Sequence, residues 1–278
     1  MGPVGLVVKL GSGVAEETAL RVVRALERYG VGVLVEESVD YESLSRYPRF
    51  SLSRDVPERI IVVGGDGTLL RTLLKLQGET PIIMGVRAGK RGFLLDVEKY
   101  EVEDRVEDFV KGNFKLVTYP RFTVYANGER IACILNDVAI VSKMAKLVRL
   151  SVMIDGYPAM RVDGDGVVIS STVGSTAYSL SAGGPIVDPR LDVLVVTPLN
   201  PVQLHLRSIV IPSGSRVEVS VTPQSNEAYL NLDGQIVREL RPGSLVAVTR
   251  CDAPVRMARF RWWDNFYERL YTRLLAYW

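Results

Sequence analysis

The feature that most constrains the fold is the alternation of short apolar runs with amphipathic stretches along the N-terminal part of the chain. Val4 to Leu10 and Val31 to Val35 have the composition of buried strands. Between them, Ala15 to Tyr29 places apolar side chains at helical spacing on one face. A strand, a helix and a second strand in this order form a βαβ unit, in which the two strands are parallel. The chain is therefore predicted to begin with an α/β domain built on an open, mostly parallel sheet.

The pattern repeats once and then changes. Ile60 to Val63 reads as a strand that runs into glycines, Thr68 to Leu76 as a helix, and Pro81 to Val86 as another strand. Beyond about residue 110, short strands alternate with turns such as Asn127-Gly128, which is typical of a β-rich domain. We expect strands at 115–125, 129–142, 148–154, 166–170, 191–197, 216–222, 227–232 and 244–249, and a short helix near 177–182. The predicted division is an α/β domain over 1–110, a β-rich domain over 111–252 and a C-terminal segment over 253–278 that ends in an amphipathic helix.

Composition narrows the range of partners. Among 278 residues 47% are hydrophobic and the formal net charge is +2, so the chain can bury a core but has no basic stripe for duplex nucleic acid. No apolar run approaches the roughly 20 residues of a membrane span, and no basic leader precedes the first strand. We expect a cytoplasmic protein without nucleic-acid or membrane partners. Asn and Gln together number eleven, a scarcity that favours a thermophilic source.

The cysteines and the one histidine form no catalytic or metal-binding pattern. Cys133 and Cys251 lie far apart in sequence and give neither a disulfide framework nor the paired spacing of a zinc site, so we expect both to be structural. His205 has no nucleophile beside it and is expected to be structural or exposed. No P-loop motif is present, and Gly11-Ser12-Gly13 lacks the third glycine of a dinucleotide fingerprint.

A phosphate-binding turn is predicted at Gly64-Gly65-Asp66-Gly67-Thr68. Glycines after a buried strand let the backbone approach a bulky anion, and the next helix begins with N–H groups directed at it. Asp66 is unusual in this setting, because a carboxylate repels phosphate unless it accepts a proton or helps to hold a metal. The turn therefore indicates phosphoryl transfer. The alternative is that Asp66 only caps the helix.

A second polar segment extends from Asp163 to Pro185. Its hydroxyls, small side chains and single tyrosine can line a pocket for a nucleotide. The pair Asp163 and Asp165 does not begin a calcium loop, because the later acidic ligands are missing. The alternative to a nucleotide pocket is that this segment is simply a connecting loop rich in serine and threonine.

Together these segments resemble the NAD kinases. The matching motifs stand in the family's order: Gly64 to Thr68, Asn136-Asp137, Gly164-Asp165-Gly166, Gly174 to Pro185 and Asp233-Gly234-Gln235. The first is shared with lipid kinases and phosphofructokinases, whereas the run from Gly174 is much more specific. The resemblance extends from about residue 60 to the C-terminus. It implies a homodimer or homotetramer whose C-terminal segment packs back on the first domain. It also implies transfer of the terminal phosphoryl group of ATP or polyphosphate to the adenosine ribose 2′-hydroxyl of NAD, giving NADP.

The resemblance also implies roles for individual residues. Asp66 resembles the catalytic base, Asn136 the adenine ligand and Asp137 the ligand of the ribose diol. Further contacts with the dinucleotide and its phosphates are expected from Gly67, Arg71, Lys146, Asp163, Asp165, Thr176, Ala177, Tyr178, Ser181 and Gln235. The phosphoryl donor is expected at Gly64, Gly65, Arg87, Lys90 and Arg91. No protein metal site is predicted, and Mg²⁺ is expected to bind mainly through the donor phosphates.

Some positions depart from the family's pattern. Arg87 replaces its usual asparagine, Lys90 and Arg91 add two cations, and Asp137 replaces a glutamate. The added charge could strengthen donor binding or change the donor; the alternative is a solvated basic turn. Two other functions stay open. One is a related lipid or sugar kinase; a lipid substrate would need an apolar, membrane-facing patch, whereas Thr176-Ala177-Tyr178 indicates a nucleoside pocket. The other is a non-catalytic NAD(P)-binding sensor, which would have no use for Asp66.

Overall fold

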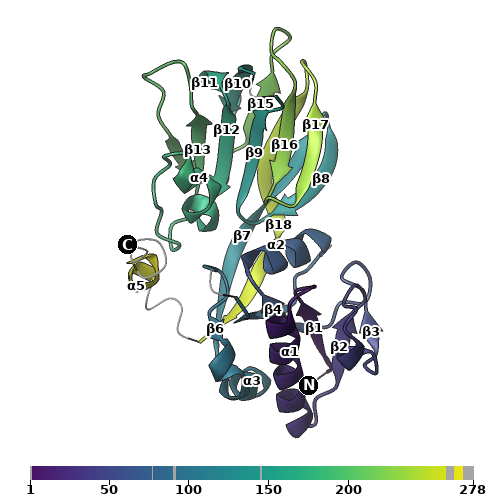
Figure 1. Ribbon diagram of the computed structural model, residues 1–278. Coiled ribbons are helices and arrows are strands. Elements are labelled where there is room, and N and C mark those ends of the chain that lie inside the picture. The colour runs from purple at the N-terminus through teal and green to yellow at the C-terminus, as the bar shows by residue number, and fades with distance from the viewer. Residues whose placement is uncertain (1, 77, 90–91, 145, 261–265, 272–278) are drawn as a thin grey trace. The chain divides into compact units, whose positions relative to one another are not determined.

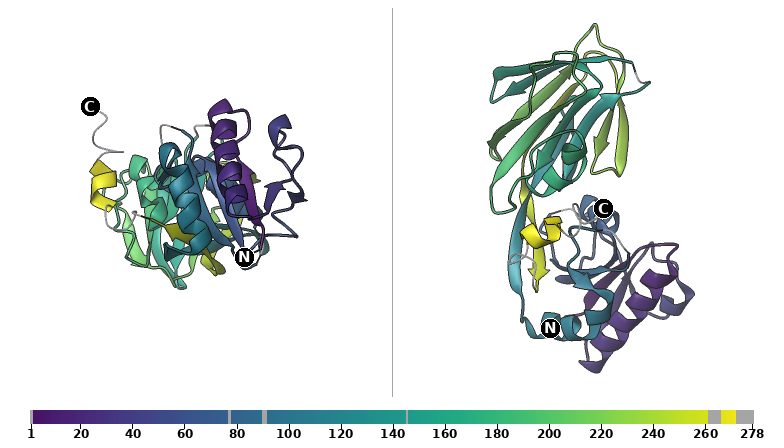
Figure 2. Two further views of the ribbon diagram at one scale, coloured as in Figure 1. Left: turned by 90° about the horizontal axis from the view of Figure 1, so that it is seen from below. Right: turned by 60° about the vertical axis from the view of Figure 1, so that its left-hand side comes forward.

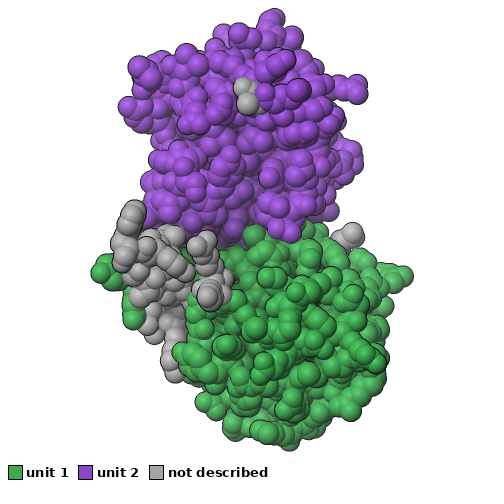
Figure 3. Space-filling view, viewed as in Figure 1, with its two compact units in different colours: residues 1–119, 254–278 green, residues 120–253 purple. Residues whose placement is uncertain are grey.

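The computed structural model describes residues 2–76, 78–89, 92–144, 146–260 and 266–271. The chain divides into two compact units, residues 1–119 with 254–278 and residues 120–253 (Figure 3). Two long strands, β7 (Lys115–Ala126) and β18 (Leu245–Arg259), contribute residues to both units. In the part of the chain that is described, no helix is long and apolar enough to cross a membrane.

The first unit is built on a parallel sheet (Figure 1). Its strands follow the order β5-β4-β1-β2-β3, and the end of β18 pairs with β5 in parallel. The strands are β1 (Val4–Val8), β2 (Val33–Glu36), β3 (Arg49–Phe50), β4 (Arg59–Gly64) and β5 (Ile82–Arg87), with β6 (Val97–Glu98) beside β5. The expected open, mostly parallel sheet is confirmed.

Helices cover this sheet. The helices of the unit are α1 (Gly13–Arg28), α2 (Asp66–Lys75), α3 (Val102–Lys111) and α5 (Phe266–Leu270), with 3-10 turns η1 (Glu42–Leu44) and η2 (Lys99–Glu101). The side chain of Ser12 caps α1 by accepting the N–H of Ala15, and the apolar face of α1 is buried. α1 and α3 pack against each other and share one apolar core with the sheet (Figure 2).

The second unit is antiparallel. One sheet has the order β14-β13-β12-β9-β16-β17, and β10, β11, β15, β8 and parts of β7 and β18 form the rest. The strands are β8 (Glu129–Ile134), β9 (Asp137–Ser142), β10 (Val148–Ile154), β11 (Tyr157–Gly164), β12 (Gly166–Ser171), β13 (Val193–Leu199), β14 (Ile209–Pro212), β15 (Val217–Val221), β16 (Ala228–Leu232) and β17 (Ile236–Leu240). Only η3 (Val173–Thr176) and α4 (Tyr178–Ser181) interrupt them within the described residues. The β-rich second part is confirmed.

Several boundaries differ from the expected ones. The run expected as one strand over 129–142 is two strands, because Leu135 and Asn136 leave the extended strand conformation and separate β8 from β9. β18 is much longer than the expected 244–249 and continues through Pro254 to Arg259. α3 was missed because only Val102, Val106 and Phe109 of its largely charged sequence are buried. The C-terminal helix is described only over α5; the rest of the expected helix lies outside the described residues.

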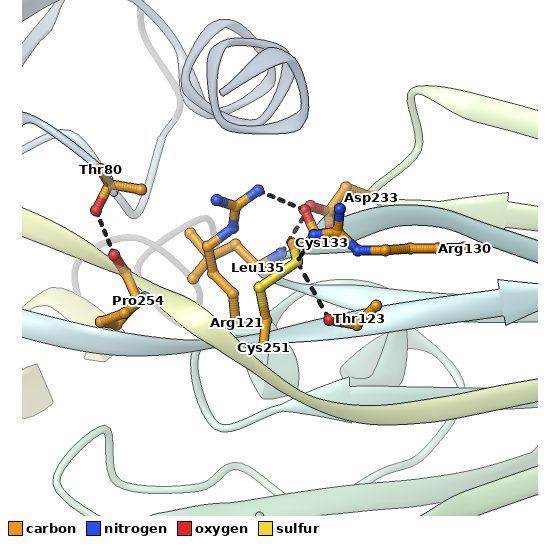
Figure 4. Close-up of a disulfide and its surroundings, with 9 residues drawn as sticks. All are labelled: Thr80, Arg121, Thr123, Arg130, Cys133, Leu135, Asp233, Cys251 and Pro254. Carbon is orange, nitrogen blue, oxygen red and sulfur yellow. Dashed lines mark hydrogen bonds between the residues drawn. A yellow bond between two sulfur atoms is a disulfide. The ribbon is translucent and has the colours of Figure 1, made fainter. Parts of the chain in front are cut away.

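Cys133 and Cys251, which were expected to be structural, form a disulfide that their spacing in the sequence did not indicate. Their Cα atoms are 6.2 Å apart (Figure 4). β7 pairs with both β8 and β18, the strands that carry the two cysteines, so the sheet brings together residues separated by 118 positions. Sequence spacing could not reveal this, because the approach depends on long-range strand pairing. Disulfides do occur in intracellular proteins of hyperthermophiles.

Candidate active site

The glycine-rich turn joins β4 to α2 in the first unit. β4 ends at Gly64, Gly65 is the N-cap residue of α2, and Asp66 is the first residue of the helix. A side chain at Gly64 would collide with Thr68, whose hydroxyl accepts the N–H of Gly65 at 3.4 Å. Any other residue at this position would force Thr68 to move, so the turn favours glycine here. It leaves the exposed residue Gly67 in the first turn of the helix.

The carboxylate of Asp66 does not cap α2. Its Oδ2 accepts the backbone N–H of Phe93 at 2.6 Å, and its Oδ1 accepts that of Leu94 at 2.9 Å. Gly92 just before them has a φ of 156°, which favours glycine. The alternative that Asp66 serves as the helix cap is therefore wrong. The carboxylate is instead half-buried and held in one orientation by a separate segment of the chain.

The cations predicted near this turn differ in their surroundings. Arg71 is exposed on α2, one turn beyond Asp66. Arg87, at the end of β5, forms a largely buried ion pair with Glu98 of β6. Lys90 and Arg91 lie outside the described residues. A further cation that was not selected from the sequence, Lys9, is exposed just after β1, the strand that neighbours β4, and its Cβ would lie 3.0 Å from a Cβ placed on Gly64. Its position at the carboxyl edge of the parallel sheet could have identified it.

In the second unit, Asp233 organises the break between β8 and β9. Its buried carboxylate accepts three backbone N–H groups, those of Leu135 at 2.8 Å, Asn136 at 2.8 Å and Asp137 at 3.0 Å. Figure 4 shows Asp233 with Leu135. The guanidinium of Arg121, also buried, donates to the carbonyl oxygen of Cys133 at 2.6 Å. These bonds fix the backbone from which the side chains of Asn136 and Asp137 project. Asp233 stood in a matched motif, but its sequence gave no sign of this role.

Asn136 presents an unused acceptor in this turn. The side chain is buried, and its Oδ1 has no hydrogen-bond partner among the described residues. Its backbone carbonyl accepts the N–H of Ser171 at 2.8 Å, and a side chain at Gly174 would collide with that carbonyl. Since a buried acceptor without a donor is costly, Oδ1 is suited to the N–H of a ligand.

Asp137 has an unusual environment. Burial and the nearby carboxylate of Asp233 raise its pKa to about 7, while a hydrogen bond from the backbone of Tyr178 acts in the opposite direction. Burial also raises the pKa of Asp233, which its three backbone donors and Arg121 oppose. Asp137 can therefore change its protonation state near neutral pH.

Three predicted residues line one pocket of about 430 Å³: Asp165, Tyr178 and Ser181. The other lining residues are Val141, Ser142, Ala182, Leu199 and Asn200. Asn200, which sequence reasoning did not select, donates from Nδ2 to Asp165 Oδ2 at 2.8 Å. The pocket combines a carboxylate, hydroxyls, an aromatic ring and aliphatic side chains, a composition that fits a nucleoside or its neighbouring sugar.

The remaining predicted residues do not line this pocket. Thr176 ends η3, and Ala177 joins it to α4. Asp163 is half-buried near the end of β11, where its N–H donates to Gln203 at 3.2 Å. Lys146 and Gln235 are exposed, the latter in the turn between β16 and β17. His205 is exposed as well, which confirms one of the two alternatives expected for it, a structural or an exposed histidine.

The described residues contain no group of three or more His, Cys, Asp or Glu side chains that could hold a metal ion. The carboxylates selected from the sequence have other partners: Asp66 accepts two backbone N–H groups, and Asp165 accepts a hydrogen bond from Asn200.

Comparison with known proteins identifies the family. The family model for the ATP-NAD kinase N-terminal domain matches residues 4–114, and that for the C-terminal domain matches residues 135–260. An NAD kinase from Aeropyrum pernix is 62% identical over 278 residues, which are 100% of this chain and 99% of that protein.

Solved structures are similar over nearly the whole chain. An NAD kinase from Archaeoglobus fulgidus in complex with ATP is 26% identical, with a TM-score of 0.78 over 96% of this chain and 98% of that one. Yeast NADH kinase complexed with NADH shares the fold at 23% identity, with a TM-score of 0.89 over 100% of this chain and 88% of that one. Because both domain models match in order and a full-length relative is 62% identical, the chain belongs to the NAD kinase family.

Proposed function

We propose that this chain is an NAD kinase that transfers the terminal phosphoryl group of ATP to the 2′-hydroxyl of the adenosine ribose of NAD, giving NADP. The observation that carries the proposal is the carboxylate of Asp66, which stands at the start of α2 in the glycine-rich turn and is oriented by two backbone N–H groups. A carboxylate in such a turn has a use when it accepts a proton from the attacking hydroxyl.

The assignment of the dinucleotide contacts belongs to this proposal. Asn136 would bind adenine through its buried Oδ1, which has no partner among the described residues, and Asp137 would accept hydrogen bonds from the ribose hydroxyls. The segment of Thr176, Ala177 and Tyr178 would enclose the adenosine, and the pocket lined by Asp165 and Ser181 would take a further part of the dinucleotide. These roles are supported by burial, by the unpaired acceptor and by the resemblance of the motifs to those of the family.

The donor and the metal are proposed on chemical grounds. The Archaeoglobus fulgidus relative was solved with ATP, which supports ATP as the donor here. Polyphosphate is the second donor that we propose, because the turn of Arg87, Lys90 and Arg91 is unusually basic. Mg²⁺ would neutralise the donor phosphates and be held mainly by them, since phosphoryl transfer depends on such neutralisation.

The assembly and the location complete the proposal. We infer a homodimer or homotetramer from the family resemblance. We propose that residues 1–110 form the α/β domain, that residues 111–252 bind the dinucleotide, and that residues 253–278 pack back on the first domain. We place the enzyme in the cytoplasm, where NAD and ATP are made available to it.

The test is an assay of product formation. The protein is supplied with NAD and either MgATP or MgCl₂ with polyphosphate, and NADP is detected through an NADP-specific dehydrogenase. NADP formed with either donor supports the proposal. Intact NAD binding without NADP under any donor would favour the non-catalytic sensor instead, and phosphorylation of a lipid or sugar alcohol but not of NAD would favour the related kinase.

A further inference from the structure

The orientation of Asp66 depends on a short stretch of irregular backbone. Residues Phe93 and Leu94, which hold both of its oxygens, belong to neither a helix nor a strand. Gly92 precedes them in a conformation that favours glycine, and a side chain there would approach Asp66 Oδ1 to 3.1 Å. An irregular segment needs contacts outside its own backbone to stay in one conformation, so the contacts that fix Leu94 also determine where the Asp66 carboxylate points.

Arg259 supplies such a contact. It is the last residue of β18, and its side chain is only 1% exposed. Its Nη1 donates to the carbonyl oxygen of Leu94 at 2.6 Å and to Oδ1 of Asp96 at 2.7 Å. The guanidinium also lies over the ring of Tyr119, 5.4 Å from its centroid. Leu94 is thus held on both sides: its N–H binds Asp66, and its carbonyl binds Arg259.

Asp96 makes the buried cation tolerable. Its side chain is 5% exposed and pairs with Arg259, and it also accepts the N–H of Phe260 at 3.4 Å. A buried ion pair must offset the loss of hydration of both charges, and a pair of apolar side chains of similar volume is often at least as stable. Stability alone therefore gives little reason for this pair, whereas a guanidinium can do what an apolar side chain cannot, namely anchor a carbonyl oxygen.

We propose that Arg259 and Asp96 are positioning residues for the catalytic carboxylate of Asp66. Arg259 fixes Leu94 through its carbonyl, Asp96 fixes the guanidinium, and the N–H groups of Phe93 and Leu94 then hold Asp66 toward the hydroxyl whose proton it accepts. The inference rests on the proposed function, since it assigns Asp66 the role of base. None of the motifs singled out from the sequence contains Arg259 or Asp96.

The test is a mutant cycle in the full-length protein. Arg259→Met with Asp96→Asn removes both buried charges together, so neither is left unpaired. We expect kcat for NADP formation to fall by about 10- to 100-fold, because small displacements of a catalytic group are costly. The KM for NAD should change little. The same pair of substitutions in an Asp66→Asn background should lower the residual rate by no more than about twofold, because the base through which the pair acts is already gone.

Controls separate positioning from general loss of structure. Arg21 of α1 pairs with Glu103 of α3 at 2.5 Å in the same unit, and its side chain also donates to the carbonyl oxygen of Lys99. Arg21→Met with Glu103→Gln should leave kcat near the wild-type value. If the Arg259 and Asp96 pair variant does not fold, as judged by circular dichroism and its thermal midpoint, Arg259→Lys replaces it in the same cycle, since it keeps the charge beside Asp96.

The outcomes are distinct. An unchanged kcat, or an equal loss with Asp66 and with Asn at position 66, would overturn the positioning role while leaving the kinase activity intact. Absence of NADP formation by the wild-type protein would instead count against the proposed function. A loss of kcat that requires Asp66, with an unchanged Arg21 and Glu103 control, supports the inference.

Discussion

The backbone N–H of Asp137 donates a hydrogen bond to Oδ1 of Asp233 at 3.0 Å, so two buried carboxylates from distant segments of the chain are neighbours. The N–H groups of Leu135 and Asn136 complete the set that Asp233 accepts. Asp233 has three backbone donors that oppose the effect of its burial, whereas Asp137 has one, the backbone N–H of Tyr178, against burial and the neighbouring charge. The pKa of Asp137 is raised to about 7, so its protonation state changes near neutral pH.

NAD affinity should depend on pH through Asp137. Its pKa is raised to about 7 by burial and by Asp233, and only the ionised carboxylate can accept hydrogen bonds from both ribose hydroxyls. Because binding then selects the ionised form, affinity should rise as the pH increases from about 6 to about 8. Calorimetry on the wild type and on Asp137→Asn tests this. The variant should lose the pH dependence and bind about 10- to 100-fold more weakly at the higher pH; a flat wild-type profile would remove Asp137 from the ribose site.

The same residue should influence stability with the opposite sign. Between about pH 4 and pH 7 the native protein keeps a proton on Asp137 that the unfolded chain has already released. Raising the pH through this range should therefore lower the free energy of unfolding, and the loss should be complete above the raised pKa. Asp137→Asn has no proton to release, so its stability should fall less steeply. Urea unfolding of both proteins at several pH values measures the difference, and parallel curves would contradict the prediction.

Much of the fold could be predicted from the sequence, because most helices and strands carry a recognisable hydrophobic pattern within their own residues. Helix α1 shows a capping serine and a regular apolar face, and β4 shows an unbroken apolar run before its glycines. The edge strands β14 and β17 were missed because they are only four and five residues long and largely exposed, so that too few residues show a regular alternation. Local patterns thus predict elements well where one face is consistently buried.

The site was less accessible, because its decisive relationships are long-range. The glycines and Asp66 could be selected from their order along the chain, but the bonds from Phe93 and Leu94 depend on how a later loop returns. Likewise, Asp233 reaches Asn136 across 97 positions. Arg87 appeared as a ligand for phosphate because nothing in its sequence surroundings indicated the ion pair with Glu98.

The basic turn should not act as one unit. Since Arg87 is already paired with Glu98, Arg87→Ala should chiefly destabilise the protein by leaving a largely buried carboxylate without its cation. Lys90→Ala with Arg91→Ala should instead raise the KM for the phosphoryl donor more than the KM for NAD. Added salt should weaken donor binding in the wild type more than in this double variant. Steady-state kinetics and thermal midpoints of both variants test these two predictions. Equal changes in the KM values for donor and NAD would show that the turn has a purely structural role.

The disulfide should contribute to stability. It closes a separation of 118 residues, and a constraint of this length on the unfolded chain is worth about 2 to 5 kcal/mol. Cys133→Ser with Cys251→Ser should lower the denaturation midpoint accordingly. A reductant should lower the midpoint of the wild type and leave that of the double variant unchanged. If reduction releases both thiols, as counted with a thiol reagent, and the midpoint stays the same, the bond is not a stabilising link.

The central assignment is that Asp66 acts as a base, and Asp66→Asn tests it. The amide keeps the shape of the side chain but retains only one acceptor oxygen, so it can satisfy Phe93 or Leu94 and not both. We therefore expect a loss of about 1 to 2 kcal/mol in stability, in line with one buried hydrogen-bond donor left unpaired.

The loss of turnover should be far larger. Because an amide cannot accept the proton of the 2′-hydroxyl, the maximal rate of NADP formation should fall by about 10²- to 10⁴-fold. The dissociation constant for NAD should change much less, since Asn136 and Asp137 are untouched by the substitution. Rate, affinity and thermal midpoint are measured on the same preparation. A folded variant with near wild-type turnover would contradict the base assignment, whereas a variant that unfolds under assay conditions would show that Asp66 mainly ties α2 to residues 93 and 94.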